Sequence, residues 1–261
     1  MDTAPQIPVV LCLSGHDPTG GAGLQADVEA VAAQGAHALG VITALTVQDT
    51  VDVRRVVPVA VAQMAEQLDV LLADCRIDAI KIGLVGDAAQ VALIRTAIER
   101  CAVPAVLDPV LRAGGGSRLA GDATTQALLD ELLPRVTVAT PNAAEARRLA
   151  PGHSDLDACA AELLSRGCRN LLVTGGDEPT ADVVNSWHRP GAAPQRFVWP
   201  RRPGGFHGAG CTLAAALAAR LAHGEALARA LRHAQAYVQA SLDHPLRIGR
   251  GRAIPRRSGH A

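Results

Sequence analysis

The chain has 261 residues, its 25 Lys plus Arg balance 25 Asp plus Glu, and 49% of its residues are hydrophobic. This length and apolar content suffice for one hydrophobic core, and no Ser-, Pro- or charge-rich linker interrupts the chain, so we expect a single domain over residues 1–261. Zero net charge and only 2% aromatic residues argue against a nucleic-acid partner.

The sequence also bears on location. No basic segment followed by a long apolar run opens the chain, and no run of about 18 uncharged apolar residues follows, so we expect no membrane association. The six cysteines form no C-x-x-C pair, which suggests a reducing cytoplasm. The basic tail from Arg247 to Arg257 is interpreted as a frayed, solvated terminus without function.

In the first half of the chain, short apolar runs alternate with longer segments of helical period. Gly35 is expected to end one helix and Pro58 to open another. In chain order, the predicted elements are a strand at Val9 to Leu13, a helix at Gly23 to Gln34, a strand at Leu39 to Val47, a helix at Pro58 to Ala73, a strand at Ala79 to Ile82, a helix at Ala88 to Arg100 and a strand at Ala105 to Leu107.

The second half continues this alternation and then changes. The predicted helices are Thr124 to Leu133, a helix capped by Asn142, Leu156 to Arg166, Gly208 to Ala222 and Glu225 to Leu242, and the predicted strands are Val136 to Ala139 and Leu171 to Val173. Asp182 to Trp187 and Arg196 to Trp199 are expected to form an antiparallel hairpin. The sum is an α/β fold with a mostly parallel central sheet, helices on both faces and an antiparallel edge hairpin.

Ligands of open α/β sheets bind beyond the carboxyl ends of the strands, and the first such loop, Ser14 to Gly23, is rich in glycine. Gly21 to Ala26 satisfies the loose dinucleotide pattern G-x-G-x-x-G/A, but the intervening Gly15 to Gly20 makes that match weak. The Walker pattern fails because Gly21 stands where lysine is required. A ligand loop is favoured over a plain connection.

A second glycine-rich turn, His207-Gly208-Ala209-Gly210-Cys211-Thr212, directly precedes a strong helical pattern. Free N–H groups and the helix dipole at such a start bind an anion, such as a phosphate in transfer. The same field is expected to lower the pKa of the Cys211 thiol and make it a proton acceptor. The alternative is a plain helix start in which Cys211 packs as a small hydrophobe, and local sequence does not separate the two.

Polar residues at two further loops suggest a metal site. Asn142 and Glu145 lie three residues apart at a helix start, where they could hold hydrated magnesium. They could instead form a capping box, which the spacing alone favours. Asp108 at a strand end could hold a metal-bound water or form a turn with Pro109.

Six ordered segments resemble the ribokinase-like superfamily and, within it, the hydroxymethylpyrimidine/phosphomethylpyrimidine kinases of thiamine biosynthesis. The resemblance implies ATP-dependent phosphorylation of 4-amino-5-hydroxymethyl-2-methylpyrimidine and then of its monophosphate. The segments are SGHDPTGGAGLQAD (residues 14–27), VITALTVQDT (41–50), IDAIKIGL (77–84), VLDPV (106–110), TPNAAEA (140–146) and HGAGCTLAAALA (207–218).

The resemblance also implies roles for individual residues. The pyrimidine would be bound by Gly15, Asp27, Gln48, Leu84 and Val110. The anion hole would comprise Gly208, Ala209, Gly210 and Cys211, with Cys211 in the place of the catalytic base. ATP would contact Thr174, Gly176, Thr212 and Arg112, and Mg²⁺ with its waters would be held by Asp108, Asn142 and Glu145.

The sequence departs from the family pattern at three places. Thr174-Gly175-Gly176-Asp177 stands where relatives often read K-G-G-H, so a lysine for ATP phosphates is missing. Arg112, in the glycine-rich segment 111–116, is expected to compensate in part, with added flexibility there. Ala209 replaces a usual Thr, which keeps the backbone donors but removes a hydroxyl.

The resemblance suggests a homodimer, and the hydrophobic edge hairpin around Phe197 and Trp199 is compatible with one. Three other functions stay open at this point. They are a kinase of the same fold acting on pyridoxal or a related ring, a non-catalytic pyrimidine-binding relative, which Thr174 favours, and nucleotide-dependent oxidation through Gly21 to Ala26.

Overall fold

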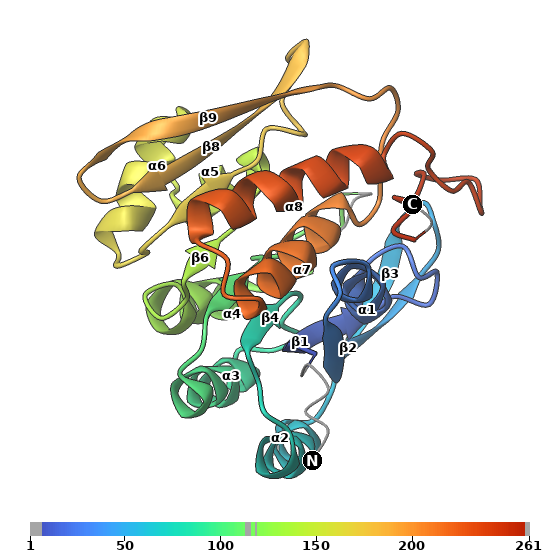
Figure 1. Ribbon diagram of the computed structural model, residues 1–261, viewed down its shortest axis with the longest axis vertical. Helices are drawn as coiled ribbons and strands as arrows, with labels where there is room; N and C mark the ends of the chain where they lie inside the picture. The colour runs from blue at the N-terminus through green and yellow to red at the C-terminus, as the bar shows by residue number, and fades with distance from the viewer. Residues whose placement is uncertain (1–6, 113–115, 118, 259–261) are drawn as a thin grey trace.

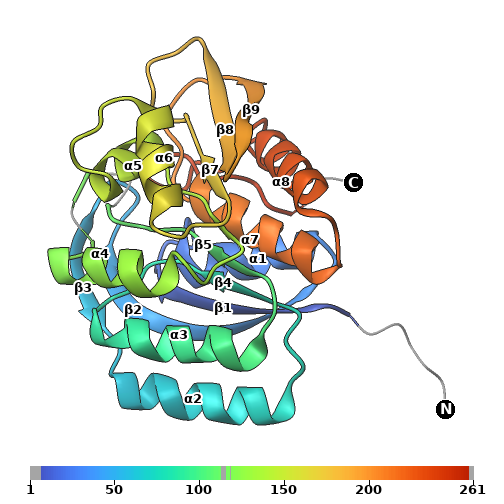
Figure 2. The ribbon, with the colours of Figure 1, turned by 90° about the vertical axis from the view of Figure 1, so that its left-hand side faces the viewer.

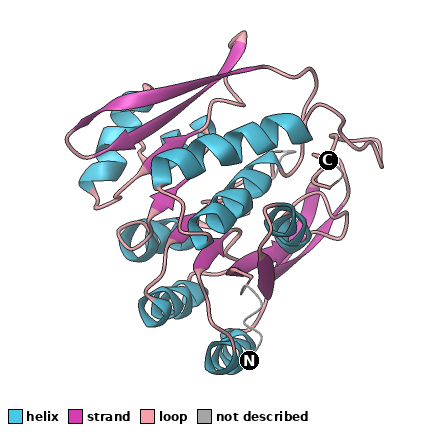
Figure 3. Ribbon diagram, in the orientation of Figure 1, coloured by secondary structure: helices cyan, strands magenta, loops and turns pink. Residues whose placement is uncertain are grey.

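The computed structural model describes residues 7–112, 116–117 and 119–258. Its centre is one nine-stranded sheet in the order β3-β2-β1-β4-β5-β6-β7-β8-β9 (Figures 1 and 3). The six strands from β2 through β1, β4, β5 and β6 to β7 pair in parallel, whereas β3, β8 and β9 pair antiparallel at the two edges. The strands are β1 (Val9–His16), β2 (His37–Gln48), β3 (Val53–Pro58), β4 (Ala79–Ile82), β5 (Ala105–Leu107), β6 (Val138–Ala139), β7 (Leu171–Val173), β8 (Asp182–Arg189) and β9 (Ala192–Pro200).

Helices cover both faces of this sheet (Figure 2). One layer consists of α1 (Gly23–Ala33), α7 (Ala209–Ala222) and α8 (Leu227–Ser241). The other consists of α2 (Val61–Asp74), α3 (Ala89–Cys101), α4 (Asp122–Ala127) with the π-helical turn η1 (Leu128–Leu132), α5 (Ala143–Leu149) and α6 (Leu156–Ser165). Each layer encloses its own apolar core against the sheet, so the sheet is buried on both sides.

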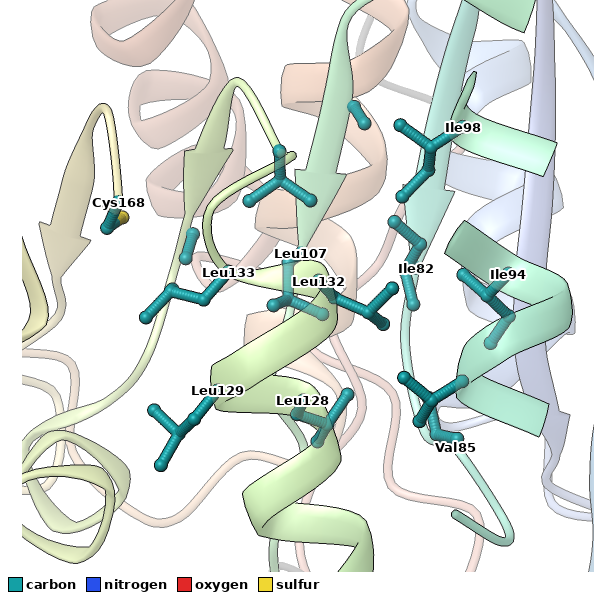
Figure 4. Close-up of a cluster of buried hydrophobic side chains, with 14 of the residues drawn as sticks. Ile82, Val85, Ile94, Ile98, Leu107, Leu128, Leu129, Leu132, Leu133 and Cys168 are labelled. Carbon is teal, nitrogen blue, oxygen red and sulfur yellow. The ribbon is translucent and has the colours of Figure 1, made fainter. Parts of the chain in front are cut away.

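This double burial explains why the central strands are mostly apolar on both faces. Along β1, Leu11 and Leu13 face the core under α2 to α6, whereas Val10 and Cys12 face the core under α1, α7 and α8. Figure 4 shows Ile82 of β4 and Leu107 of β5 beside Ile94 of α3 and the leucines of η1. The alternation places Lys81, the one charged residue of β4, on the α7 side of the sheet.

The predicted fold class is confirmed, with one strand missed. The helix expected to open at Pro58 begins at Val61, and Pro58 instead ends β3, which pairs with β2. Proline is tolerated there because β3 is an edge strand. The helix predicted from Thr124 to Leu133 is present, but it changes from α4 to the π-helical turn η1 at Leu128.

The edge hairpin is confirmed, but its exposed apolar residues differ from those predicted. Phe197 is buried, and the Trp199 indole donates a hydrogen bond to Gln235 Oε1 of α8 at 3.1 Å. The outward-facing large apolar side chains are instead Val184 and Val198. Side chains alternate between the two faces of a strand, and α8 covers one face of this hairpin.

The prediction of a frayed C-terminal tail is wrong for residues 246–257. Leu246 and Ile254 form an antiparallel bridge, and Ala253 pairs with Phe206. Ala253, Ile254 and Arg257 are buried. Basic composition suggested solvation, but the tail packs against residues distant in sequence that no local pattern reveals.

None of the helices in the described part of the chain has the length and apolar character needed to cross a bilayer.

Candidate active site

A cavity of about 1210 Å³ lies at the carboxyl ends of the parallel strands, where the fold class predicts a ligand site. Loops that follow β1, β4, β5, β6 and β7 contribute to its lining, together with the start of α7. Among the predicted site residues, those that line it are Gly15, Gln48, Leu84, Asp108, Val110, Arg112, Asn142, Glu145, Thr174, Gly176, Gly208, Ala209, Gly210 and Cys211. Asp27 and Thr212 do not line it and are fully buried.

The N-terminus of α7 opens into this cavity. Gly208, its N-cap, has φ of 87°, and no side chain of the described residues caps the helix. A side chain at this position would overlap the carbonyl oxygen of Gly21, so only glycine fits. The first N–H groups of a helix have no partner within it, so those of Ala209, Gly210 and Cys211 are available to an anion.

Cys211 lies beside Asp108 at this helix start, and interaction with the Cys211 side chain acts to lower the pKa of Asp108. Burial raises the pKa of Cys211 to about 12, although the positive charge of Lys81 opposes the change. The prediction of a lowered thiol pKa is therefore wrong, because desolvation outweighs the helix dipole and the nearby cation. A pKa this high keeps Cys211 as a protonated thiol at neutral pH.

Asp108 and Glu145 form a pair of buried acids. Burial raises the pKa of Asp108 to about 6, and burial together with the negative charge of Asp108 raises the pKa of Glu145 to about 8. Two like charges in a desolvated site favour either a proton or a cation between them. This chemistry fits a divalent cation, although the described residues contain no group of three or more His, Cys, Asp or Glu side chains arranged as direct metal ligands.

The capping box proposed for Asn142 and Glu145 is confirmed. Asn142 Oδ1 accepts the Glu145 N–H at 2.8 Å, and Glu145 Oε2 accepts the Asn142 N–H at 3.0 Å. Glu145 Oε1 accepts a third bond, from the Leu111 N–H at 3.3 Å. With both Glu145 oxygens engaged, a metal ion at this place would be reached most readily through its water ligands.

A buried ion pair supports the floor of the site. Lys81 Nζ lies 2.8 Å from the Asp27 carboxylate and 3.0 Å from Ser14 Oγ. Burial alone would lower the pKa of Lys81, but Asp27, with smaller contributions from Cys211 and Asp108, raises it above its ordinary value. Lys81 thus keeps a fixed positive charge near the two acidic groups of the site, and the Asp27 side chain is committed to holding it.

The two glycine-rich segments meet at a hydrogen bond between His207 and Asp17. His207 Nε2 lies 2.7 Å from Asp17 Oδ2, and the other Asp17 oxygen accepts bonds from the N–H and hydroxyl of Thr19, each at 2.8 Å. Burial acts to raise the pKa of Asp17, but hydrogen bonds from His207 and the Thr19 backbone hold it well below its usual range. The loop after β1 is thereby fastened to the turn before α7.

Comparison with known proteins identifies the family. The phosphomethylpyrimidine kinase family model matches residues 17–256. The chain belongs to the phosphomethylpyrimidine kinase family. It is 35% identical to the hydroxymethylpyrimidine/phosphomethylpyrimidine kinase of Rhizobium meliloti (strain 1021) over 94% of each chain, and 38% identical to the thiamine biosynthesis bifunctional protein ThiED of Geobacter sulfurreducens over 93% of this chain and 50% of that protein.

Solved structures extend the comparison to the fold. The pyridoxal kinase of Staphylococcus aureus, in complex with pyridoxal, superposes with a TM-score of 0.87 at 25% identity over 96% of this chain and 94% of that one. The same enzyme has been solved with AMP-PCP and with ADP. A phosphomethylpyrimidine kinase and a pyridoxal kinase thus share this architecture, so the fold does not choose the substrate.

The loop after β7 contains Thr174 and Asp177, the two residues expected from the resemblance to depart from the family pattern. The Asp177 carboxylate accepts the N–H groups of Ala143 and Ala144 at 3.2 and 3.0 Å, so it caps α5 from outside. Arg201 of the segment after β9 donates to the Gly176 carbonyl at 2.7 Å and to the Glu178 carbonyl at 2.7 Å. Asp177 therefore stabilises the loop, and Arg201 places a positive charge beside it.

Sequence reasoning assigned no individual role to four residues that support this site, Ser14, Asp17, Lys81 and Arg201, and it did not predict the contact of His207 with Asp17. One signal was available, since a lysine within the apolar run 79–82 cannot be solvated if that run is a central strand. Asp17 and His207 were visible only as members of two separate motifs, because their contact spans 190 positions. The segment 113–115, expected to be flexible, lies outside the described residues.

Proposed function

We propose that this kinase transfers the γ-phosphoryl group of ATP to the hydroxyl of hydroxymethylpyrimidine, and then a second phosphoryl group to the monophosphate, in thiamine biosynthesis. The observation that carries the proposal is the uncapped N-terminus of α7, which opens into the cavity beside Cys211 and Asp108. The names of the relatives support the pyrimidine as the substrate. Positioned backbone donors suit phosphoryl transfer, which depends mainly on alignment and charge stabilisation.

The pyrimidine is proposed to lie between the ends of β1 and β2. A Cβ at Gly15 would come within 2.9 Å of Leu84 Cδ2, so the lack of a side chain at Gly15 leaves space for the ring beside that leucine. Gln48 supplies an amide donor and acceptor for the aminopyrimidine edge, and Val110 an apolar contact. Because Asp27 is buried against Lys81, we propose that it acts through that lysine instead of touching the ring.

The proton of the substrate hydroxyl is proposed to leave through Cys211. The oxygen–phosphorus bond forms as the bond to the leaving ADP breaks, the hydroxyl proton passes to Cys211 Sγ, and the original thiol proton passes to the Asp108 carboxylate. A pKa of about 6 lets Asp108 accept that proton near neutral pH. The raised thiol pKa is compatible with this route, since no free thiolate is needed.

The nucleotide is proposed to lie against the loops after β6 and β7. Arg112, Thr174 and Gly176 line this part of the cavity. Thr212 is less suited to direct contact, because its hydroxyl donates to the Gly208 carbonyl at 2.7 Å. Asp108, Asn142 and Glu145 would hold Mg²⁺ through its waters, and the ion would neutralise phosphate charge.

The test is ATP-to-ADP turnover measured with hydroxymethylpyrimidine, its monophosphate and pyridoxal side by side. We expect kcat/KM to be highest for the two pyrimidines. Faster turnover of pyridoxal would favour the rival kinase that the structural likeness raises, and binding of the pyrimidine without turnover of any substrate would indicate a non-catalytic relative. In the same assay, Cys211→Ala should lower kcat by ~10²-fold or more, the scale of a lost proton-transfer group.

We also propose a cytoplasmic location and a homodimer. A reducing compartment would keep Cys211 as a thiol. The outward-facing Val184 and Val198 of the edge hairpin offer an apolar surface for self-association. Analytical ultracentrifugation of the wild type and of Val198→Lys separates the two assembly states, with a shift to monomer expected in the variant.

A further inference from the structure

The C-terminal segment 246–257, which we name the C-terminal strap, follows α8 (Figure 1), and its Ala253 pairs with Phe206 of the segment that precedes α7. Its Ala253 carbonyl accepts the His207 N–H at 2.8 Å, next to the start of α7. At the other side, the Arg252 N–H donates to the Thr50 carbonyl and the Gly251 N–H to the Thr50 hydroxyl, each at 3.0 Å. The strap therefore contacts both the turn before α7 and the segment that follows Gln48.

The strap places the buried, positively charged side chain of Arg257 behind the proposed phosphate site. The Arg257 side chain is 1% exposed. Its Nε donates to Thr212 Oγ1 at 2.8 Å, its Nη1 to the Gly20 carbonyl at 3.2 Å, and its Nη2 to the Gly21 carbonyl. Nη1 also lies 3.1 Å from Glu29 Oε2 of α1.

These bonds join segments whose relative position sets the shape of the anion hole. The Gly21 carbonyl packs so closely on Gly208 that a side chain at 208 has no room, and Arg257 Nη2 would lie 2.8 Å from a Cβ there. The guanidinium therefore lies directly behind the N-cap of α7. The planar guanidinium of arginine has five N–H donors and can bond to several acceptors at fixed angles. A lysine ammonium cannot reproduce this arrangement.

The positive charge of Arg257 also bears on phosphate binding. Burying a guanidinium is costly unless its donors are used, and its one carboxylate partner among the described residues, Glu29, is 52% exposed. Three of its acceptors are carbonyl or hydroxyl oxygens, which leave most of the positive charge in place behind the anion hole. A cation at that place favours bound phosphate as well as rigid geometry.

We propose that Arg257 is a positioning residue for phosphoryl transfer: it locks the Gly20-Gly21 loop against the start of α7, so that the backbone donors of the anion hole are already aligned when phosphate binds. This inference rests on the phosphate site proposed above. It gives a function to the basic tail, which the sequence alone did not. A displacement of the donors by a fraction of an ångström is enough to slow transfer substantially.

The test compares Arg257→Ala and Arg257→Lys with Arg256→Ala, a neighbouring arginine that is exposed and donates to the His244 carbonyl instead. We expect Arg257→Ala to lower kcat by ~10-fold or more while KM for the pyrimidine changes less than ~3-fold, since it is the transfer step that loses alignment. Arg257→Lys should recover only part of kcat, Arg256→Ala should behave as wild type, and millimolar guanidinium should partly restore Arg257→Ala.

Hydrogen exchange provides a readout independent of turnover. Amides of residues 20–23 and 209–212 should exchange faster in Arg257→Ala than in the wild type. If Arg257→Ala does not fold, Thr212→Val removes the acceptor of Arg257 Nε, together with the bond from the Thr212 hydroxyl to the Gly208 carbonyl, and should lower kcat several-fold. Wild-type kcat and exchange in the folded variants would overturn the positioning role. If Cys211→Ala also kept wild-type turnover, the phosphate site itself would be misplaced, so the two failures are distinguishable.

Discussion

Two helix N-termini, those of α5 and α7, line the same cavity, and the chain treats them in opposite ways. At α5, the N–H groups of residues 142–145 are bonded to the side chains of Asn142, Glu145 and Asp177. At α7, the N-cap is a glycine, and no side chain of the described residues accepts a hydrogen bond from the first N–H groups. A helix start binds an external anion only where the protein leaves its donors unused, which supports the proposal of α7 as the phosphate site and α5 as a scaffold.

The largest expected effect comes from closing the open helix start. Gly208→Ala would put a Cβ onto the Gly21 carbonyl and force a left-handed φ on alanine, so the turn must shift. We expect kcat to fall by ~10²-fold or more, the scale of a lost oxyanion-hole donor. Steady-state kinetics of the purified variant would measure it.

A matched control for that variant is Gly121→Ala at the N-cap of α4. Gly121 has an ordinary φ of −71°, and no atom lies within 4 Å of its would-be Cβ. This variant should retain wild-type kcat. Equal losses of kcat in both variants would mean that substitution of any N-cap glycine slows the enzyme. That result would contradict a specific role of the α7 N-terminus in phosphate binding.

The capped helix start should respond mainly in stability. Asn142→Ala removes the acceptor for the Glu145 N–H and should lower the free energy of unfolding by about 1 kcal/mol. Asn142→Ser keeps a capping oxygen and should restore most of that loss, which urea denaturation can measure. If Asn142→Ser is stable but needs more Mg²⁺ for half-maximal rate, Asn142 also contributes to the metal site; unchanged Mg²⁺ dependence would limit it to capping.

The smallest effect expected is a pH dependence of stability that comes from the buried acids Asp108 and Glu145. The pKa values of Asp108, about 6, and Glu145, about 8, exceed their unfolded values of 3.8 and 4.5. The folded state therefore binds more protons than the unfolded state between about pH 4 and 8, so stability should decrease as pH rises through that window. Thermal denaturation from pH 5 to 8, with and without Mg²⁺, measures this decrease.

Glu145→Gln should flatten that pH dependence, and Mg²⁺ should reduce it in the wild type by favouring the ionised acids. A wild-type profile that is flat in the absence of Mg²⁺ would contradict the raised pKa values. Asp17 works in the opposite direction, because its pKa is lowered. The stability it contributes is present above its unfolded pKa of 3.8 and is lost only as pH falls below that value, outside the tested window.

The amino-acid sequence by itself determined the fold class and most of the cavity lining. Strands such as Ala79–Ile82 and Leu171–Val173 were predicted to the residue, since short apolar runs between glycines and helical segments leave little choice. Glycine-rich turns placed after strands then indicated the loops that converge on one edge of the sheet. Local periodicity and turn chemistry encode both features.

Only the tertiary structure decided how the charged groups are used. Asp27 was expected at the ligand but is buried against Lys81, and Cys211 was expected to be acidic but is desolvated. Arg257 lay in a tail expected to be solvated but bonds to Gly20 and Gly21, more than 230 positions away. Burial and long-range pairing determine whether a titratable group is charged and what it bonds to, and local sequence reveals neither.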